Sequence, residues 1–332
     1  MPSIAPLDTD PENLGHVEWA GFVNGNPAFA GVSGAVHLLA DCHRVIEAHD
    51  GLLAACTSLD QKTLLTSGED GKVCAIDDTG GLTVLAEHKG KWIDRLAAGP
   101  SGVIAYAAGK TATVLTGKDS KEIVCERSVE GLAFAPKGMR LAIARYNGVE
   151  LHWINTASPS QFLDWKGAHT GAIFSPDGRY VVSQMQENAL HGWRLADGRH
   201  MRMTGYPAKV HSVSWSTKGK WLATSGAPAA ITWPFSGKDG PMGKAPKELG
   251  AMGNLLVTQV ACHPAEDVVA IGYEDGMVAA VRIEDGKEAL LKRAGKGAIS
   301  ALNWDAKGGR LAYGSAAGEA GIIDLGGQLA DS

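Results

Sequence analysis

Residues 129–156, VEGLAFAPKGMRLAIARYNGVELHWINT, and residues 170–198, TGAIFSPDGRYVVSQMQENALHGWRLADG, show the same order of features. Each begins with an apolar stretch that ends in Phe, passes through a Pro-containing turn and an aliphatic stretch, and ends in a stretch that carries Trp. Trp153 and Trp193 are separated by 193 − 153 = 40 residues, and Trp193 and Trp233 by 233 − 193 = 40. A period near 40 built from short strands is typical of the blades of a propeller.

The apolar first strand of this repeat recurs along the whole chain. Its copies start near residues 17, 52, 93, 129, 170, 210, 257 and 299. Alternation with a period of two, with Gly, Asp, Asn and Pro between the stretches, favours strands over helices. Four short strands per unit make a propeller blade. We therefore expect an all-β fold over residues 1–332, a single closed β-propeller of four-stranded antiparallel blades.

The number of blades depends on whether every copy forms a sheet of its own. Eight copies favour eight blades, and seven is the alternative if one weak unit, best matched by the first, is used elsewhere. After the last third strand only GGQLADS (residues 326–332) remains, which is short for an outer strand. We expect residues near Ser3–Asp8 to supply that strand, which would seal the sheet edges of the array.

The repeat resembles the WD-repeat β-propeller family over roughly residues 17–325. The turns Ser175–Gly178 (SPDG), Glu69–Gly71 and Glu274–Gly276 (both EDG) carry the resemblance. None of the third strands ends in Trp-Asp, so the repeats are degenerate.

In that family a His, a Ser or Thr, an Asp and the Trp form a structural hydrogen-bond network. For the second unit the resemblance implies His49, Ser67 and Asp70, with Ala75 near the Trp position. It also implies that Trp153, Trp193 and Trp233, which recur at fixed positions, lie in the core between blades.

Composition excludes several classes of partner. The net charge is −5 and no long Lys/Arg run occurs, so we expect neither nucleic acid nor an anionic membrane as a partner. No run of eighteen apolar residues is present to span a bilayer, and the N-terminal stretch lacks the apolar core of a signal peptide. The five cysteines, Cys42, Cys56, Cys74, Cys125 and Cys262, are scattered without paired spacing. These features favour a cytoplasmic protein with reduced thiols, and we expect a monomer.

Motifs for catalysis are missing, so we expect no enzymatic activity and no cofactor. The adjacent pairs Cys42-His43 and Cys262-His263 are the best candidates for a metal site. Neighbouring residues of a strand point to opposite faces, so each pair offers at most one of the three or four ligands that zinc requires. A buried Cys beside a turn His is the preferred interpretation. A propeller enzyme or metal-handling protein that uses the channel mouth is the alternative.

The preferred function is a non-enzymatic scaffold or adaptor that binds a protein or peptide partner. WD-repeat propellers commonly bind partners on the face that carries the loops before the first strands and the turns between second and third strands. The residues that the resemblance places on this face as contacts are Trp92, Asp94, Arg145, Tyr146, His211 and Tyr273.

Overall fold

The computed structural model describes residues 3–6 and 14–326 of the chain. It contains two compact units: unit 1 comprises residues 1–48, 78–80 and 211–332, and unit 2 comprises residues 49–77 and 81–210. The elements with described bounds are the strands β1 to β30 and one 3₁₀ turn, η1 (Pro100–Gly102). Within the described residues no helix is long and apolar enough to cross a membrane. The all-β prediction is confirmed, and the expectation of one domain over residues 1–332 stays a prediction.

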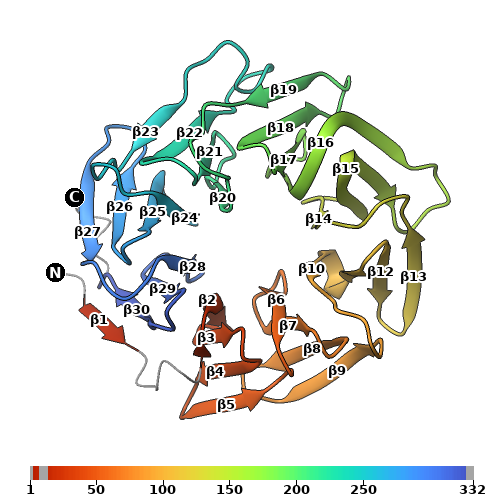
Figure 1. Cartoon of the computed structure of the whole chain (residues 1–332), viewed down its shortest axis with the longest axis horizontal. Helices are drawn as coiled ribbons and strands as arrows, with labels where there is room; N and C mark the ends of the chain where they lie inside the picture. Colours follow the sequence, from red (N-terminus) through yellow and green to blue (C-terminus); the bar gives the residue numbers. More distant parts are fainter. Residues whose placement is uncertain (1–2, 7–13, 327–332) are drawn as a thin grey trace. The chain divides into compact units, whose positions relative to one another are not determined.

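Unit 1 contains four antiparallel sheets of four strands, which can be followed by their labels in Figure 1. The first three are β2 (Val17–Val23), β3 (Asn26–Gly31), β4 (Ala35–Leu39), β5 (His43–Glu47); β20 (Val213–Trp215), β21 (Trp221–Thr224), β22 (Ala230–Pro234), β23 (Lys247–Leu249); and β24 (Val257–Cys262), β25 (Val268–Tyr273), β26 (Val278–Arg282), β27 (Glu288–Lys292). The fourth is β28 (Ile299–Trp304), β29 (Arg310–Ser315), β30 (Ala320–Asp324) and β1 (Ser3–Pro6).

Unit 2 contains two sheets of four strands and one of six. The four-stranded sheets are β6 (Leu52–Thr57), β7 (Thr63–Gly68), β8 (Lys72–Asp77), β9 (Leu82–Glu87); and β10 (Arg95–Ala98), β11 (Ile104–Ala108), β12 (Thr111–Thr116), β13 (Asp119–Val124). The six-stranded sheet is β14 (Gly131–Phe134), β15 (Arg140–Trp153), β16 (Gln161–Phe174), β17 (Tyr180–Met185), β18 (Ala189–Arg194), β19 (His200–Met203).

The preferred count of eight separate blades is wrong, because the described residues form seven sheets. The fourth and fifth copies of the repeat, which were expected near residues 129 and 170, share the six-stranded sheet. They are joined because β15 and β16 are both 14 residues long: the first part of β16 pairs with β15 and its last part with β17. The first copy of the repeat, which the seven-blade alternative left out, forms the regular sheet of β2–β5.

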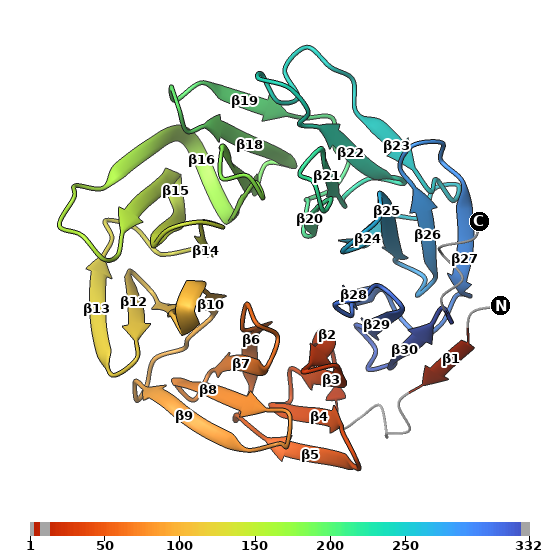
Figure 2. The same cartoon turned by 180° about the vertical axis from the view of Figure 1, so that it is seen from behind.

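The last sheet takes its outer strand from the N-terminal end of the chain, as predicted. β1 pairs antiparallel with β30, with Ser3 opposite Asp324 and Pro6 opposite Gly321. Both views show β1 beside β30 (Figures 1 and 2). Residues 7 and 8 of the predicted segment lie outside the described residues, and closure of the whole array stays a prediction.

Within each unit, neighbouring sheets pack through the start of the first strand. The apolar residues that open seven of the eight predicted copies are buried: Val17, Leu52, Ile93, Val129, Val210, Val257 and Ile299. In unit 1, a Cβ on Gly272 would lie 2.6 Å from Ile299, and a Cβ on Gly314 would lie 2.3 Å from Val17. Glycine at these two positions of β25 and β29 therefore makes room for the β-branched residue of the next sheet.

Of the three regularly spaced tryptophans, Trp193 is buried as expected and Trp233 is half-buried. The core assignment of Trp153 is wrong, because its side chain is 38% exposed. The pairing of β15 with β16 ends at Leu151 opposite Gln161. Trp153 therefore lies beyond the last paired residue, where the guanidinium of Arg140 lies over its ring at 5.3 Å from the centroid.

The hydrogen-bond network predicted for the second copy of the repeat is present, with one residue changed. His49 Nδ1 lies 3.0 Å from Asp70 Oδ1, and His49 Nε2 lies 2.9 Å from Thr66 Oγ1. Burial opposes ionisation of Asp70, but the bonds from His49 and from the Lys72 N–H outweigh it and lower the pKa of Asp70. The Asp70 carboxylate thus accepts a hydrogen bond from the Nδ1–H of His49, and His49 Nε2 accepts a hydrogen bond from the Thr66 hydroxyl. The assignment of Ser67 to this role is wrong, since the buried Ser67 hydroxyl has no hydrogen-bond partner among the described residues.

These contacts predict opposite effects for two adjacent substitutions. Thr66→Val should lower the free energy of unfolding by about 1–3 kcal/mol, because it leaves a buried ring nitrogen of His49 unpaired. Ser67→Ala should leave stability unchanged or raise it, because it removes an unsatisfied buried hydroxyl. Chemical denaturation of both variants measures the difference, and equal losses would contradict the assignment.

Candidate functional site

A hollow of about 410 Å³ opens in unit 2 where the two halves of the six-stranded sheet meet. It lies beside the β15–β16 junction and the turn between β17 and β18. The sequence analysis placed the contacts with a partner at this end of the strands. Its lining residues are Tyr146, Trp165, Lys166, Gly167, Met185, Glu187 and Arg202. We call this surface the junction hollow.

A distortion of the β15–β16 pair shapes the junction hollow. The register shifts between Tyr146 and Gly148, and Asn147 between them adopts the left-handed conformation with φ of 70°. Asn tolerates this conformation better than most residues do. Its Oδ1 accepts a bond from the Gly167 N–H at 3.4 Å, while the Ala168 N–H donates to Glu187 Oε1 at 3.3 Å. The two walls of the hollow are therefore tied to each other.

A buried arginine holds Tyr146 from beneath. Arg145 Nη2 donates to Glu150 Oε1 at 2.9 Å, and Nη1 donates to the Tyr146 carbonyl at 3.2 Å. Its guanidinium also lies 4.3 Å from the ring centroid of Phe162. Bonds from His152 and Arg145 lower the pKa of Glu150 to about 2, so the pair remains ionised at neutral pH. With its backbone fixed in this way, the half-exposed Tyr146 ring is presented to solvent at 47% exposure.

Stacked rings lie behind the other wall. Trp165 stacks on His191 with centroids 3.9 Å apart, and His191 in turn stacks on His200 at 5.3 Å. His191 is fully buried, and neither of its ring nitrogens has a hydrogen-bond partner in the part of the chain that the structure describes. Burial, together with the positive potential of His200, His169 and Arg202, lowers the pKa of His191 to about 3. The neutral ring therefore serves as an apolar plate against which Trp165 is fixed.

The surface of the junction hollow combines aromatic rings with net positive charge. Lys166 and Arg202 are both exposed, and neither forms an ion pair with any residue in the part of the chain that the structure describes. Glu187 is the one acidic residue in the lining, and its carboxylate already accepts the Ala168 N–H. The arrangement can bind an anionic group beside an apolar or aromatic one.

The residues predicted to contact a partner are distributed over both units. In unit 2, Tyr146 lines the junction hollow, whereas Trp92, 63% exposed, and Asp94, paired with Arg95 at 3.2 Å, lie in the β9–β10 link outside its lining. In unit 1, His211 is exposed, and its N–H donates to Ser225 Oγ.

Two of the predicted contact residues are buried, and their role in binding a partner stays a prediction. Tyr273 has no exposed surface, and its hydroxyl donates to the Gly250 carbonyl. Arg145 is also buried and supports Tyr146 from within. Tyr273 lies in β25 and Arg145 in β15, each near the end of the second strand of its repeat. Neighbouring segments of the same chain cover both side chains there.

Sequence reasoning missed Trp165, Lys166 and Arg202, which form most of the charged and aromatic surface. Trp165-Lys166 lies in the link between the two quoted copies of the repeat, residues 129–156 and 170–198, and belongs to neither. The adjacent aromatic and basic residues of that link were the available signal.

The cysteine and histidine pairs have structural contacts. His263 Nδ1 accepts the N–H groups of Ala265 and Glu266, so its Nε2–H donates to the Gly308 carbonyl at 3.1 Å. Burial raises the pKa of Cys262 to about 12, and its thiol donates to the Ser214 carbonyl. His43 Nε2 lies 3.0 Å from His37 Nδ1. Within residues 3–6 and 14–326, no three His, Cys, Asp or Glu side chains gather as metal ligands would.

Comparisons with known proteins agree with this architecture. Residues 40–77 and 199–227 match the family model described as WD domain, G-beta repeat. The chain therefore carries WD40 repeats at two places, and the resemblance inferred from its sequence is confirmed. No significant match is found among curated protein sequences.

Two solved structures share the fold. The crystal structure of the computationally designed Ika8 protein superposes with a TM-score of 0.75 at 16% identity, over 94% of this chain and 96% of that one. The structure of U3-55K, a WD-repeat protein, superposes with a TM-score of 0.64 at 16% identity, over 85% of this chain and 98% of that one. The fold of this chain is that of a β-propeller.

The buried imidazole predicts a loss of stability in acid. The folded-state pKa of His191 lies below the ordinary value of 6.5, so protonation favours the unfolded chain. Its contribution is complete above pH 6.5 and declines as the pH falls toward about 3. His191→Phe keeps the stacked ring and removes the titration, so melting temperature should fall less between pH 7 and pH 5 than in the wild type. A parallel decline in both proteins would contradict this role. His37→Phe is the matched comparison, since burial lowers the pKa of His37 to about 4.

Proposed function

We propose that this protein is a non-enzymatic scaffold that binds an acidic segment of a partner protein in the junction hollow. WD-repeat propellers are typically protein-interaction scaffolds, which supports the general role. The alternative of a propeller enzyme or metal-handling protein has no observation in its favour among the described residues.

One observation carries the choice of this surface. Tyr146 and Trp165 border a hollow whose two exposed cations, Lys166 and Arg202, have no ion-pair partner among the described residues. An acidic side chain of a bound segment would neutralise these cations, and an apolar neighbour would cover the rings. Aromatic residues and Arg are enriched among residues that dominate binding energy at interfaces.

Preorganisation favours the same surface. The Asn147–Gly167 and Ala168–Glu187 bonds hold its walls, and Arg145 holds the Tyr146 backbone. A site that is rigid before binding loses less conformational freedom when a partner arrives. Trp92 and Asp94 are proposed as further contacts at the separate β9–β10 link, because Trp92 is an exposed aromatic side chain.

Charge reversal tests the proposal. Proteins captured from a lysate of the native cells by the wild type should be lost with a Lys166→Glu, Arg202→Glu double variant, as read by quantitative mass spectrometry. Capture by the wild type should also weaken as salt rises, since exposed charges are screened. Single Tyr146→Ala should weaken capture without lowering the melting temperature, because the ring is half-exposed.

The matched control is Lys137→Glu, an exposed lysine on the turn between β14 and β15 that does not line the hollow. It should capture the same proteins as the wild type. A protein retained equally by the wild type and the double variant does not bind this surface, and retention of all of them would refute the proposal.

A further inference from the structure

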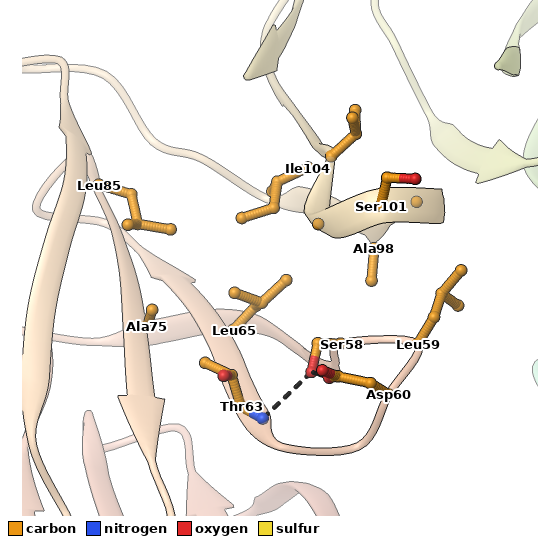
Figure 3. A pocket seen from close by; sticks show the side chains of 13 residues that line it. Ser58, Leu59, Asp60, Thr63, Leu65, Ala75, Leu85, Ala98, Ser101 and Ile104 are labelled. Carbon is orange, nitrogen blue, oxygen red and sulfur yellow. Dashed lines mark hydrogen bonds between the residues drawn. The ribbon is translucent and has the colours of Figure 1, made fainter. Parts of the chain in front are cut away.

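A second and larger pocket lies in unit 2 at the other ends of its strands. It has a volume of about 660 Å³ and is formed by the β6–β7 turn, the β10–β11 turn with η1, and the faces of β8 and β9 (Figure 3). These turns join first and second strands, whereas the junction hollow is built on the turn between second and third strands. The pocket therefore constitutes a separate site.

The lining of this pocket is mainly apolar. Leu65, Leu85 and Ile104 point toward a common space in Figure 3, and the small side chains of Ala75 and Ala98 also line it. Leu85 is 37% exposed, and Leu59 at the tip of the β6–β7 turn is 64% exposed. Apolar side chains left this open to water are stabilised when another apolar group covers them.

Hydrogen bonds within both turns define the walls. The Gly99 N–H donates to the Val103 carbonyl at 2.7 Å, which closes the turn around η1. Ser58 Oγ donates to Asp60 Oδ1 at 2.7 Å and accepts the Thr63 N–H at 3.1 Å. The space is consequently bounded by ordered turns.

One negative charge marks the rim. Asp60 is the single charged residue in the lining, and no Lys or Arg accompanies it there. Hydrogen bonding from Ser58 and from the Lys62 N–H lowers the pKa of Asp60, so it remains a carboxylate. Both of these bonds reach Oδ1. The rim thus offers a fixed negative charge next to an apolar space.

We propose that this pocket receives a large apolar side chain from an extended peptide segment of a partner protein, with a Lys or Arg next to it facing Asp60. The apolar lining selects the first group and the lone carboxylate selects the second. The exposed Leu82 and Val84 of β9 pair with Ile76 and Cys74, whereas Ala75 of the pocket pairs with Thr83, so Leu82 and Val84 lie on the other face of this sheet. An extended chain can fill the pocket with one side chain and also reach the exposed Leu59 and Asp60 at its rim, whereas a small molecule would fill the pocket alone.

Selection from a display library of random short peptides tests this site directly. Enriched peptides should carry Leu, Ile, Met or Phe adjacent to Lys or Arg, and synthetic copies should bind the purified full chain in a fluorescence anisotropy titration. Leu85→Lys should weaken their binding at least about tenfold, because it removes apolar contact and repels the basic residue. Asp60→Asn keeps the turn's acceptor oxygen and should weaken binding less, while reducing its salt dependence.

Val84→Lys is the matched control, because Val84 is the exposed neighbour of Leu85 on β9 but does not line the pocket. It should leave affinity within twofold of the wild type (about 0.4 kcal/mol). Failure to select such peptides, or equal affinity in the Leu85→Lys variant, would overturn the proposal. So would self-association of the chain that sedimentation detects and Leu85→Lys abolishes, since a second copy would then be the occupant. Lys166→Glu, Arg202→Glu should not affect these peptides, so this test and that of the junction hollow fail independently.

Discussion

Burial of the apolar residue that opens seven of the eight repeats is the constraint on which the rest of the structure depends. A sheet of four short strands exposes too much apolar surface to be stable alone, and it gains stability only from its neighbour. In unit 1 this contact is tight enough that Gly272 and Gly314 leave room for Ile299 and Val17. The same requirement recurs from one repeat to the next, so an apolar residue returns at a regular spacing along the sequence. That return is what makes the repeat visible in a degenerate sequence.

The candidate site arises where this regularity is broken. Elsewhere each sheet ends at its outer strand, but β16 continues from one half of the six-stranded sheet into the other. The bulge beside Asn147 and the continuation through Trp165 place side chains that a regular blade would separate on two sides of one hollow. Internal bonds of Arg145 and stacking on His191 then fix the two aromatic rings. The candidate surface is thus a product of the irregular backbone, and its two cations, Lys166 and Arg202, are left without ion-pair partners within the described residues.

Much of the fold could be predicted because its signals are local. Strand alternation and turn residues place the first strands, and the shortage of sequence after β30 predicts the role of β1. The joined sheet could not be predicted, because the pairing of β15 with β16 depends on contacts across a link that reads as a spacer. Burial of Tyr273 depends on the Gly250 segment that covers it. The choice between Thr66 and Ser67 turns on one residue of register, which reverses the face that a side chain occupies. Of the residues that line the junction hollow, the sequence therefore indicated Tyr146 but not Trp165 or Arg202.

The pairing of β1 with β30 sets an order on the assembly of the chain. Residues 3–6 are synthesised more than 300 residues before their partner strand, residues 320–324. During synthesis β1 has no native partner until residues 320–324 have been made, and contacts between such distant residues form slowly. An incomplete product that stops before β30 cannot finish its last sheet and keeps an unsatisfied strand. The pairing of β1 with β30 thus acts as a check that synthesis has reached residues 320–324, since only a product that contains both strands can join them.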